Sequence, residues 1–258
     1  MRRQLERARR APPVARLAAD AAGLPLGALL ALLAAARGGK AFHPAGAVHA
    51  ATLRVHGVPS APPAELLRTP AAHAALVRFS RSLGLPRPLP DLLGMSVRLP
   101  DVHGPGAHQD LLLVSSADLP VLHHLFLPAG DVQRRPYTSA LPYRAGGELV
   151  LLGALPDPDS PRPAGEDELV RLAAAARTGK LRFRLAVAGV GGRFRPVATL
   201  EVGERLGDPL DALRFNPWNT GGGLEPAGWL NRARAWAYPL SQAAWGRAAR
   251  HGDGAPAA

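Results

Sequence analysis

Two residues near the end of the sequence have the types and the spacing for chemistry at a metal. Arg234 and Tyr238 are four residues apart, so on a helix their side chains project from the same face. A free phenol ionises at about pH 10, and a tyrosinate that serves as a ligand at neutral pH therefore needs a nearby positive charge. Arginine supplies that charge without losing its own proton. An arginine packed along an aromatic ring has the same spacing, so spacing alone leaves both interpretations open.

Three further residues lie where a polar side chain could act beside such a ligand. His43 precedes the first predicted strand, from where its side chain can point into the mouth of a barrel. Alternation along the next strand places Arg78 and Ser80 on one face. The serine hydroxyl could fix a histidine tautomer, or this face could be a solvated strand end. His123 and His124 are adjacent in a helical stretch, where side chains diverge by roughly 100 degrees, so we expect both to be structural.

Several other kinds of site are excluded. Cysteine is absent, so the chain has no disulfide framework, no thiolate metal site and no thiol nucleophile. It has no glycine loop that could cradle a phosphate, no Gly-x-Ser-x-Gly elbow and no His-Glu-x-x-His motif. Carboxylates and histidines do not recur at metal-ligand spacing, which argues against phosphoester hydrolysis. A metal here therefore needs other ligands.

The middle of the chain has the pattern of an antiparallel sheet or barrel. Short β-rich segments are separated by proline and glycine. In one segment Leu181, Phe183 and Leu185 alternate with Arg182 and Arg184, which predicts a strand with one face towards the core. The predicted strands span residues 48–56, 74–80, 95–99, 110–115, 148–154, 181–188 and 197–202.

Helices are predicted before, within and after this β-rich region. Acidic residues at the start and Arg177 at the end favour a helix over residues 167–177. A short helix is expected within residues 118–127, and a longer helical segment over residues 225–250, interrupted at Pro239. The apolar run 24–36 predicts a helix packed on the domain, because it is too short to cross a bilayer.

Composition narrows the partners and the compartment. At 258 residues the chain is long enough for one large domain. A net charge of +11 would ordinarily suggest nucleic acid or an anionic membrane. However, Lys40 and Lys180 are the only lysines and the arginines are scattered, which is typical of a coding bias towards arginine. We therefore expect that the protein binds neither nucleic acid nor a membrane, and that it is cytoplasmic.

Seven segments in chain order resemble the core of the monofunctional haem catalases, from about Lys40 to Arg250. Each segment by itself is short, and their shared order makes the resemblance specific. The seven segments are Phe42-His43-Pro-Ala-Gly46, Val77-Arg78-Phe79-Ser80, Asp91-Leu-Leu-Gly94-Met-Ser-Val-Arg98, Gln109-Asp110-Leu111, Pro196–Leu206, Phe215-Asn216-Pro217-Trp-Asn219, and Arg234-Ala-Trp-Ala-Tyr238-Pro239.

The resemblance implies a role for each matching residue. Tyr238 would be the proximal iron ligand of haem b, as tyrosine is in catalases, and Arg234 would hold its phenolate. His43 would be the distal acid–base group, and Ser80 would orient its ring. The implied fold is α+β, an antiparallel β-barrel with an N-terminal helix and a C-terminal segment that carries the proximal helix. The domains would be 1–39 as a helical extension, 40–252 as the haem-binding barrel and 253–258 as a disordered tail.

The haem propionates and the pocket differ from the family pattern. Lys40 and Arg78 match positions whose cations hold the propionates, and lysine at position 40 keeps the charge but loses the bidentate fork of arginine. Trp245 replaces a propionate-binding arginine and would contact the cofactor instead. Phe42 replaces a small residue beside the distal histidine. Residues 115–118 lack the asparagine that helps to position peroxide, so disproportionation of hydrogen peroxide is placed in doubt.

These features predict a haem-dependent oxidoreductase of the peroxidase or catalase-like type. Its substrates would be hydrogen peroxide or organic hydroperoxides together with a small electron donor, and assembly into a homo-oligomer is compatible with the sequence. The chain is shorter than those catalases, which leaves no room for their threading arm, nucleotide site and helical domain. Two alternatives stay open. One is a non-catalytic haem-binding or structural protein, and the other is a fatty-acid-hydroperoxide isomerase that resembles allene oxide synthase.

Overall fold

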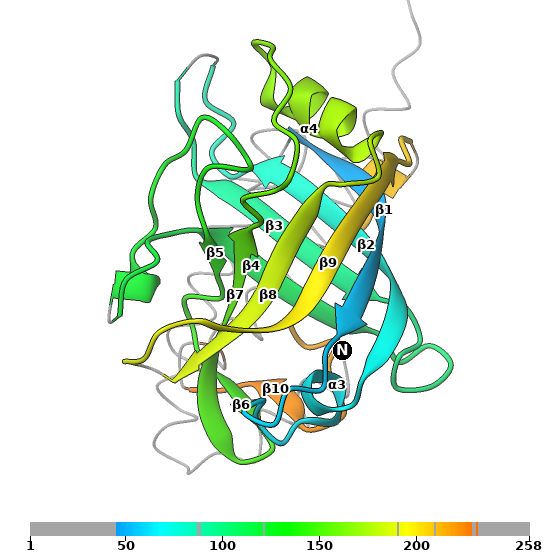
Figure 1. Ribbon diagram of the computed structural model, residues 1–258, viewed down its shortest axis with the longest axis vertical. Coiled ribbons are helices and arrows are strands. Elements are labelled where there is room, and N and C mark those ends of the chain that lie inside the picture. The colour runs from blue at the N-terminus through cyan, green and yellow to red at the C-terminus, as the bar shows by residue number, and fades with distance from the viewer. Residues whose placement is uncertain are drawn as a thin grey trace, which may run out of the picture. The chain divides into compact units, whose positions relative to one another are not determined.

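The computed structural model in Figure 1 describes residues 45–86, 89–120, 122–189, 191–208, 210–228 and 231. The chain divides into two compact units, one formed by Ala45–Pro226 and the other by Met1–Pro44 with Ala227–Ala258. Almost all described residues belong to Ala45–Pro226, and the fold of that unit follows. The predicted N-terminal helix, the disordered tail and the domain boundaries at 39/40 and 252/253 lie outside the described residues.

Eight antiparallel strands close into a barrel. Their order is β7-β5-β4-β3-β2-β1-β9-β8, and β8 pairs again with β7 to complete the ring. Two short strands extend the sheet beyond the ring, because β6 pairs with β7 and β10 pairs with β6. The strands are β1 (Ala45–Val55), β2 (Ala71–Arg81), β3 (Leu93–Leu99), β4 (Gln109–Ser115), β5 (Tyr137–Thr138), β6 (Tyr143–Ala145), β7 (Glu148–Pro156), β8 (Arg182–Gly189), β9 (Arg195–Arg205) and β10 (Leu224–Pro226).

The barrel interior is filled by the apolar residues of the alternating pattern. Phe183, Leu185 and Val187 of β8 all lie in one buried cluster, together with inward side chains of the other strands. On the opposite face of β8, Arg182 is exposed and Arg184 is half-buried. All seven predicted strands overlap strands of the barrel, so the expectation of an antiparallel barrel is confirmed.

One predicted helix is confirmed and closes one end of the barrel. Helix α4 (Glu168–Ala176) begins after Asp167, whose carboxylate accepts hydrogen bonds from the amides of Leu169 and Val170. Its first residue, Glu168, pairs with Arg81 at the end of β2 (Nη1–Oε1 3.0 Å), and both side chains are buried. This ion pair ties α4 to the barrel, at the end opposite the short helix α3 (Glu65–Arg68), as Figure 1 shows.

The short helix expected within residues 118–127 is present as a single 3₁₀ turn, η1 (Leu122–His124). Another helix prediction needs correction. Glu225 and Pro226, predicted to begin a helix, belong instead to strand β10, where Glu225 pairs with Arg144 and Pro226 with Tyr143 of β6. Pairing with a distant strand overrides the local helical pattern at this point. The rest of the predicted helix 225–250 lies outside the described residues, apart from a few positions. Within the described residues no helix is long and apolar enough to cross a membrane.

Candidate functional site

Two of the seven predicted site residues lie in the described part of the chain, and both are on β2. Arg78 and Ser80 stand on the same face, opposite the face that carries Val77 and Phe79 into the core. Both are buried, with 5% of Arg78 and 2% of Ser80 exposed. The other predicted site residues lie outside the described residues, and these are Lys40, His43, Arg234, Tyr238 and Trp245.

Small residues flank Ser80 on both neighbouring strands. Ser80 is paired with Gly46 of β1 on one side and with Gly94 of β3 on the other. A Cβ atom added at Gly46 would lie 2.5 Å from the carbonyl oxygen of Phe79 and 2.8 Å from a guanidinium nitrogen of Arg78. The Arg78 side chain therefore reaches along the outer wall of the barrel and covers Gly46. Arg78 and Ser80 thus lie on one face of β2, with glycines beside Ser80 on both neighbouring strands.

The charge of Arg78 is balanced by a carboxylate that the sequence did not indicate. Burial lowers the pKa of Arg78, and the negative charge of Asp211 partly offsets this effect. Asp211 lies in the 3₁₀ turn η2 (Leu210–Ala212), and its carboxylate accepts hydrogen bonds from the Val48 amide (2.8 Å) and from Arg205 (2.7 Å). Partial burial raises the pKa of Asp211, but these two hydrogen bonds and the charges of Arg205 and Arg78 outweigh it and lower the pKa.

A second residue that sequence reasoning missed lies just inside the barrel wall. His49 of β1 is fully buried against the edge of Phe79, with ring centroids 6.1 Å apart. Its Nδ1 lies 3.0 Å from the carbonyl oxygen of Gly203, so the neutral ring carries its proton there. Its Nε2 has no hydrogen-bond partner in the described structure. Burial, more than the charge of Arg205, lowers the pKa of His49. The sequence signal was a histidine at an inward position of an alternating strand.

Three of the segments that carry the family resemblance meet at one buried carboxylate. Arg98 of β3 donates two hydrogen bonds to the carboxylate of Asp110 on β4, from Nε to Oδ1 (2.7 Å) and from Nη2 to Oδ2 (2.6 Å). The backbone amide of Asn216 (2.8 Å) and the side-chain amide of Asn219 (2.9 Å) also donate to Asp110 Oδ2. The ring of Phe215 lies under the Arg98 guanidinium at 5.1 Å. These contacts bring the three motifs together in one structural joint.

The loop after β4 uses its polar side chains to hold its own backbone. The Ser115 hydroxyl donates to the Leu127 carbonyl (2.7 Å), and the Ser116 hydroxyl to the carbonyls of His123 (3.0 Å) and Leu125 (2.6 Å). The fully buried His123 ring lies against carbonyl oxygens through both nitrogens, at Ala117 and Gly192. These contacts are structural in character.

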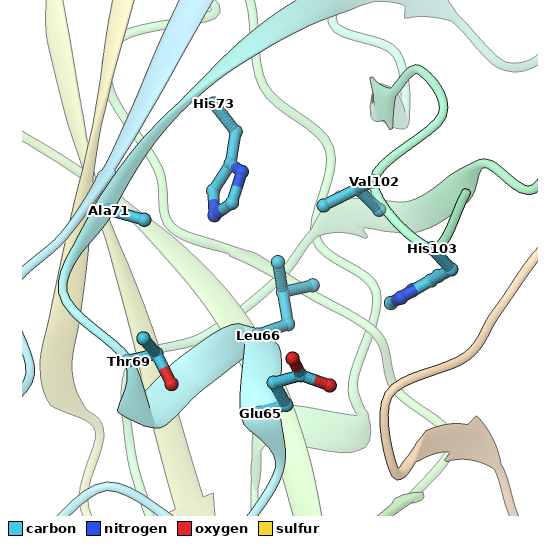
Figure 2. A pocket seen from close by; sticks show the side chains of 7 residues that line it. All are labelled: Glu65, Leu66, Thr69, Ala71, His73, Val102 and His103. Atoms are coloured by element: carbon cyan, nitrogen blue, oxygen red, sulfur yellow. The ribbon is translucent and has the colours of Figure 1, made fainter. Parts of the chain in front are cut away.

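A small pocket lies at the barrel end that carries α3, away from the surface around Arg78 and Ser80. Its volume is about 100 Å³, and Figure 2 shows seven residues around it, namely Glu65, Leu66, Thr69, Ala71, His73, Val102 and His103. Nε2 of His103 donates to Gln109 Oε1 (3.0 Å), an oxygen that also accepts from the Gly221 amide. Among the described residues no group of three or more histidines and carboxylates could hold a metal ion.

Comparison with known proteins gives matches in structure and none in sequence. Neither a protein-family model nor the sequence of a curated protein matches the chain. A bacterial catalase structure superposes with a TM-score of 0.55 at 12% identity, over 79% of this chain and 56% of that chain. A fungal catalase crystal structure superposes with a TM-score of 0.58 at 13% identity, over 78% of this chain and 58% of that chain. This chain thus spans little more than half the length of these catalases, and at such identity the likeness shows that it has a catalase-like fold.

Proposed function

We propose that the protein is a haem-dependent oxidoreductase that acts on peroxides. The observation that carries the proposal is the position of Arg78 and Ser80 on the same outward face of β2, with the Arg78 guanidinium over Gly46. In the catalases that the sequence motifs resemble, the matching arginine holds a haem propionate and the matching serine orients the distal histidine. The catalase-like fold supports the same use of these two residues here.

The described residues fit a haem group on physical grounds. A haem is a flat apolar ring with two carboxylates, so it needs a smooth surface and nearby cations. Gly46 and Gly94, the partners of Ser80 on β1 and β3, have no side chains that would stand between Ser80 and a bound ring. Arg78 is a buried cation on the same wall, and a guanidinium binds a carboxylate through two parallel hydrogen bonds. Asp211 moderates this positive charge from the side of β1.

The residues that would complete the site come from the family resemblance. Tyr238 would be the proximal iron ligand, and Arg234 would stabilise its phenolate. Lys40 would hold a propionate together with Arg78, and Trp245 would contact the cofactor where the family has an arginine. All but Arg78 lie outside the described residues. Tyr137 is unsuited to ligation, since burial, aided by the charge of Asp131, raises its pKa well above the usual value and keeps that phenol neutral.

The chemistry proposed for the chain's own residues is a proton transfer. When bound, haem supplies the iron at which the O–O bond of hydrogen peroxide or an organic hydroperoxide is cleaved. His43 would accept the proton of the hydroperoxide and return it to the departing oxygen. Ser80 would hold the ring of His43 in one orientation through a hydrogen bond. A small electron donor would then restore the resting protein.

A second candidate is a protein that binds haem without peroxide turnover. It is favoured by the loop after β4, where the family has an asparagine that helps to position peroxide. Ser115 and Ser116 occupy this stretch, and both hydroxyls are engaged by backbone carbonyls. Neither hydroxyl proton is therefore free to donate to a bound peroxide as an asparagine amide could.

The absorbance spectrum of the protein supplied with haem tests ligation. We expect a high-spin ferric spectrum typical of tyrosinate ligation, which is lost in Tyr238→Phe. Tyr137→Phe is the matched control, because its buried neutral phenol cannot serve as the ligand, and its spectrum should be unchanged. A chain that takes up no haem would contradict both candidates.

Turnover of peroxide separates the two candidates. His43→Ala should keep the tyrosinate spectrum and lose about 10²–10⁴ in rate, the usual contribution of general acid–base catalysis. Ser80→Ala should lose less, because it removes only the group that orients the ring. A haem-loaded wild type without turnover would favour the second candidate, and full activity in His43→Ala would show that the distal residue is another one.

A further inference from the structure

The pocket at the α3 end of the barrel is lined by polar side chains from three separate segments. Glu65 is the first residue of α3, His73 lies on β2, and His103 lies between β3 and β4. In the part of the chain that the structure describes, neither the Glu65 carboxylate nor the His73 ring has a hydrogen-bond or ion-pair partner. Figure 2 shows the rings of His73 and His103 approaching the space around Leu66 from two sides. The pocket thus offers polar groups that a ligand could engage.

The neutral ring of His103 has a lone pair to offer, because its proton is held at the other nitrogen. A backbone amide can only donate, so the Gln109 Oε1 atom that lies 3.2 Å from the Gly221 amide is an acceptor. His103 Nε2 lies 3.0 Å from the same oxygen and therefore carries the proton, which leaves a lone pair on Nδ1. Gln109 is fully buried, so solvent does not compete for this contact.

Gly222 allows His103 to lie close to α3. Its φ is +56°, and a Cβ atom there would lie 2.9 Å from Cε1 and 3.3 Å from Nδ1 of His103, and 3.7 Å from Cβ of Glu65. The edge of the imidazole that carries Nδ1 and the base of the Glu65 side chain therefore both border Gly222. The Gly222 carbonyl accepts from the Glu65 amide (3.0 Å), and the Glu65 carbonyl accepts from the Thr69 amide (3.1 Å). This backbone is ordered without a ligand, which lowers the entropic cost of binding.

The lining of the pocket suits a small cation with a hydrocarbon part. Glu65 is the only carboxylate among the seven lining residues, and none of the seven is a lysine or an arginine. Leu66, Ala71 and Val102 provide an apolar side. A volume of about 100 Å³ corresponds to about three water molecules at their density in the liquid, so only a ligand of a few heavy atoms fits.

We propose that this pocket binds a short aliphatic ammonium ion, the protonated form of a small primary amine. An ammonium group has three N–H donors and no acceptor, which matches the Glu65 carboxylate, the His103 Nδ1 lone pair and the Thr69 hydroxyl. A ligand carboxylate would be repelled by Glu65. A metal ion is a poorer match, because no group of three or more histidines and carboxylates among the described residues could hold one. The pocket lies away from Arg78 and Ser80, so the proposal does not depend on haem.

Titration of the full-length protein with n-propylammonium chloride tests the site. The imidazole Cε1–H signals in NMR spectra report on the pocket, and His73→Gln and His103→Leu identify the two signals by their loss. We expect both signals to shift saturably with a Kd of about 1 mM, the affinity that an efficient ligand of this size reaches. At the same ionic strength 1-propanol should bind about tenfold more weakly, because it forms no charge-assisted hydrogen bond. Propionate should leave both signals unchanged.

Glu65→Gln separates recognition of charge from recognition of shape. The amide keeps the size of the side chain but removes its negative charge, so n-propylammonium should bind about fivefold more weakly and 1-propanol as before. Glu166→Gln is the matched control, since Glu166 is an exposed carboxylate just before α4, at the opposite end of the barrel, and it should leave binding unchanged. His103→Leu removes the Nδ1 lone pair and should also weaken n-propylammonium binding, as read from the His73 signal.

Four other results would overturn the proposal. Equal affinities for 1-propanol and n-propylammonium would show a pocket that does not recognise charge. Shifts of both signals with propionate would assign the pocket to an anion. Saturation of both signals by equimolar zinc chloride would assign it to a metal ion. Signals that do not move at about 50 mM n-propylammonium, far above the expected Kd, would show that no amine binds there.

Discussion

Arg98 and Asp110, on the adjacent strands β3 and β4, form a two-point ion pair with distances of 2.7 and 2.6 Å, and Asp110 is fully buried. The same carboxylate receives hydrogen bonds from Asn216 and Asn219, which are more than one hundred residues away in the chain. This joint fixes the segment after η2 against the barrel. It also places three motifs of the catalase-like pattern in direct contact.

Asp110→Ala should lower the free energy of unfolding by about 3–5 kcal/mol, because it leaves the Arg98 guanidinium without its buried partner. Urea denaturation followed by circular dichroism measures this loss. Arg54→Ala is the control, since the Arg54–Glu201 pair is largely exposed, and it should cost less than about 1 kcal/mol. Equal effects of the two substitutions would show that the joint at Asp110 contributes no more than a surface pair.

Gly46→Ala should lower the free energy of unfolding by about 1–3 kcal/mol, because the new Cβ atom would collide with the Phe79 carbonyl and with Arg78. The displaced guanidinium should also weaken haem uptake, which a haem titration followed by absorbance measures. Gly189→Ala is the matched control, since a Cβ atom there meets nothing within 4 Å. Unchanged stability in Gly46→Ala would mean that Arg78 moves away at no cost.

Stability should depend on pH through His49. Burial lowers its pKa in the folded protein, so at pH values below about 6.5 the unfolded chain binds a proton that the folded protein does not. The stabilising contribution of neutral His49 to the free energy of unfolding should therefore be complete above about pH 6.5 and decrease as the pH is lowered towards the folded-state pKa. Urea midpoints measured between about pH 5 and 8 would show this slope.

His49→Asn separates this titration from the packing of the ring. Asparagine can still donate to the Gly203 carbonyl but does not titrate, so the slope below about pH 6.5 should become smaller. Phe79→Leu, which removes the ring contacts of Phe79 with His49 and Phe183 but no titratable group, should lower stability similarly at every pH. A slope that persists in His49→Asn would assign the pH dependence to other groups.

Tyr137→Phe should lower the free energy of unfolding by about 1–2 kcal/mol, because the buried Val132 carbonyl loses its hydrogen bond of 2.8 Å from the phenol. The raised pKa of Tyr137 gives a second signature. Its stabilising effect is complete below the pKa of a free phenol, about 10, and is lost as the pH rises above it. Alkaline destabilisation should accordingly be weaker in Tyr137→Phe than in the wild type, and equal profiles would contradict this.

The sequence predicts the strands and α4 well because both depend on local patterns. Alternation with a period of two marks β8 through Phe183 and Leu185, and an acidic start with Asp167 as the cap marks α4. The helix predicted from Glu225 failed at its start because β10 consists of only three residues, Leu224–Pro226, and exists through its pairing with β6. A strand of three residues is too short to show an alternating pattern in the sequence.

For the candidate site, the sequence indicated Arg78 and Ser80 as residues on one face, and the structure confirms that placement. It gave no sign of Asp211, which reaches β1 from a turn 163 residues further along the chain than Val48. His49 was also overlooked, because one histidine in an apolar alternation is a weak signal. The predicted roles of His43 and Tyr238 stay predictions.

By itself the sequence determined the strand periodicity, the capped helix and the ordered motifs that resemble the catalases, since these reside in neighbouring residues. Only the tertiary structure decided that β7 and β8 close the ring, that Asp110 binds both Arg98 and the amide of Asn216, and that Asp211 lies beside β1. The physical reason is that strand partners and loop neighbours are selected by long-range packing and chain closure, which leave no periodic mark in the sequence.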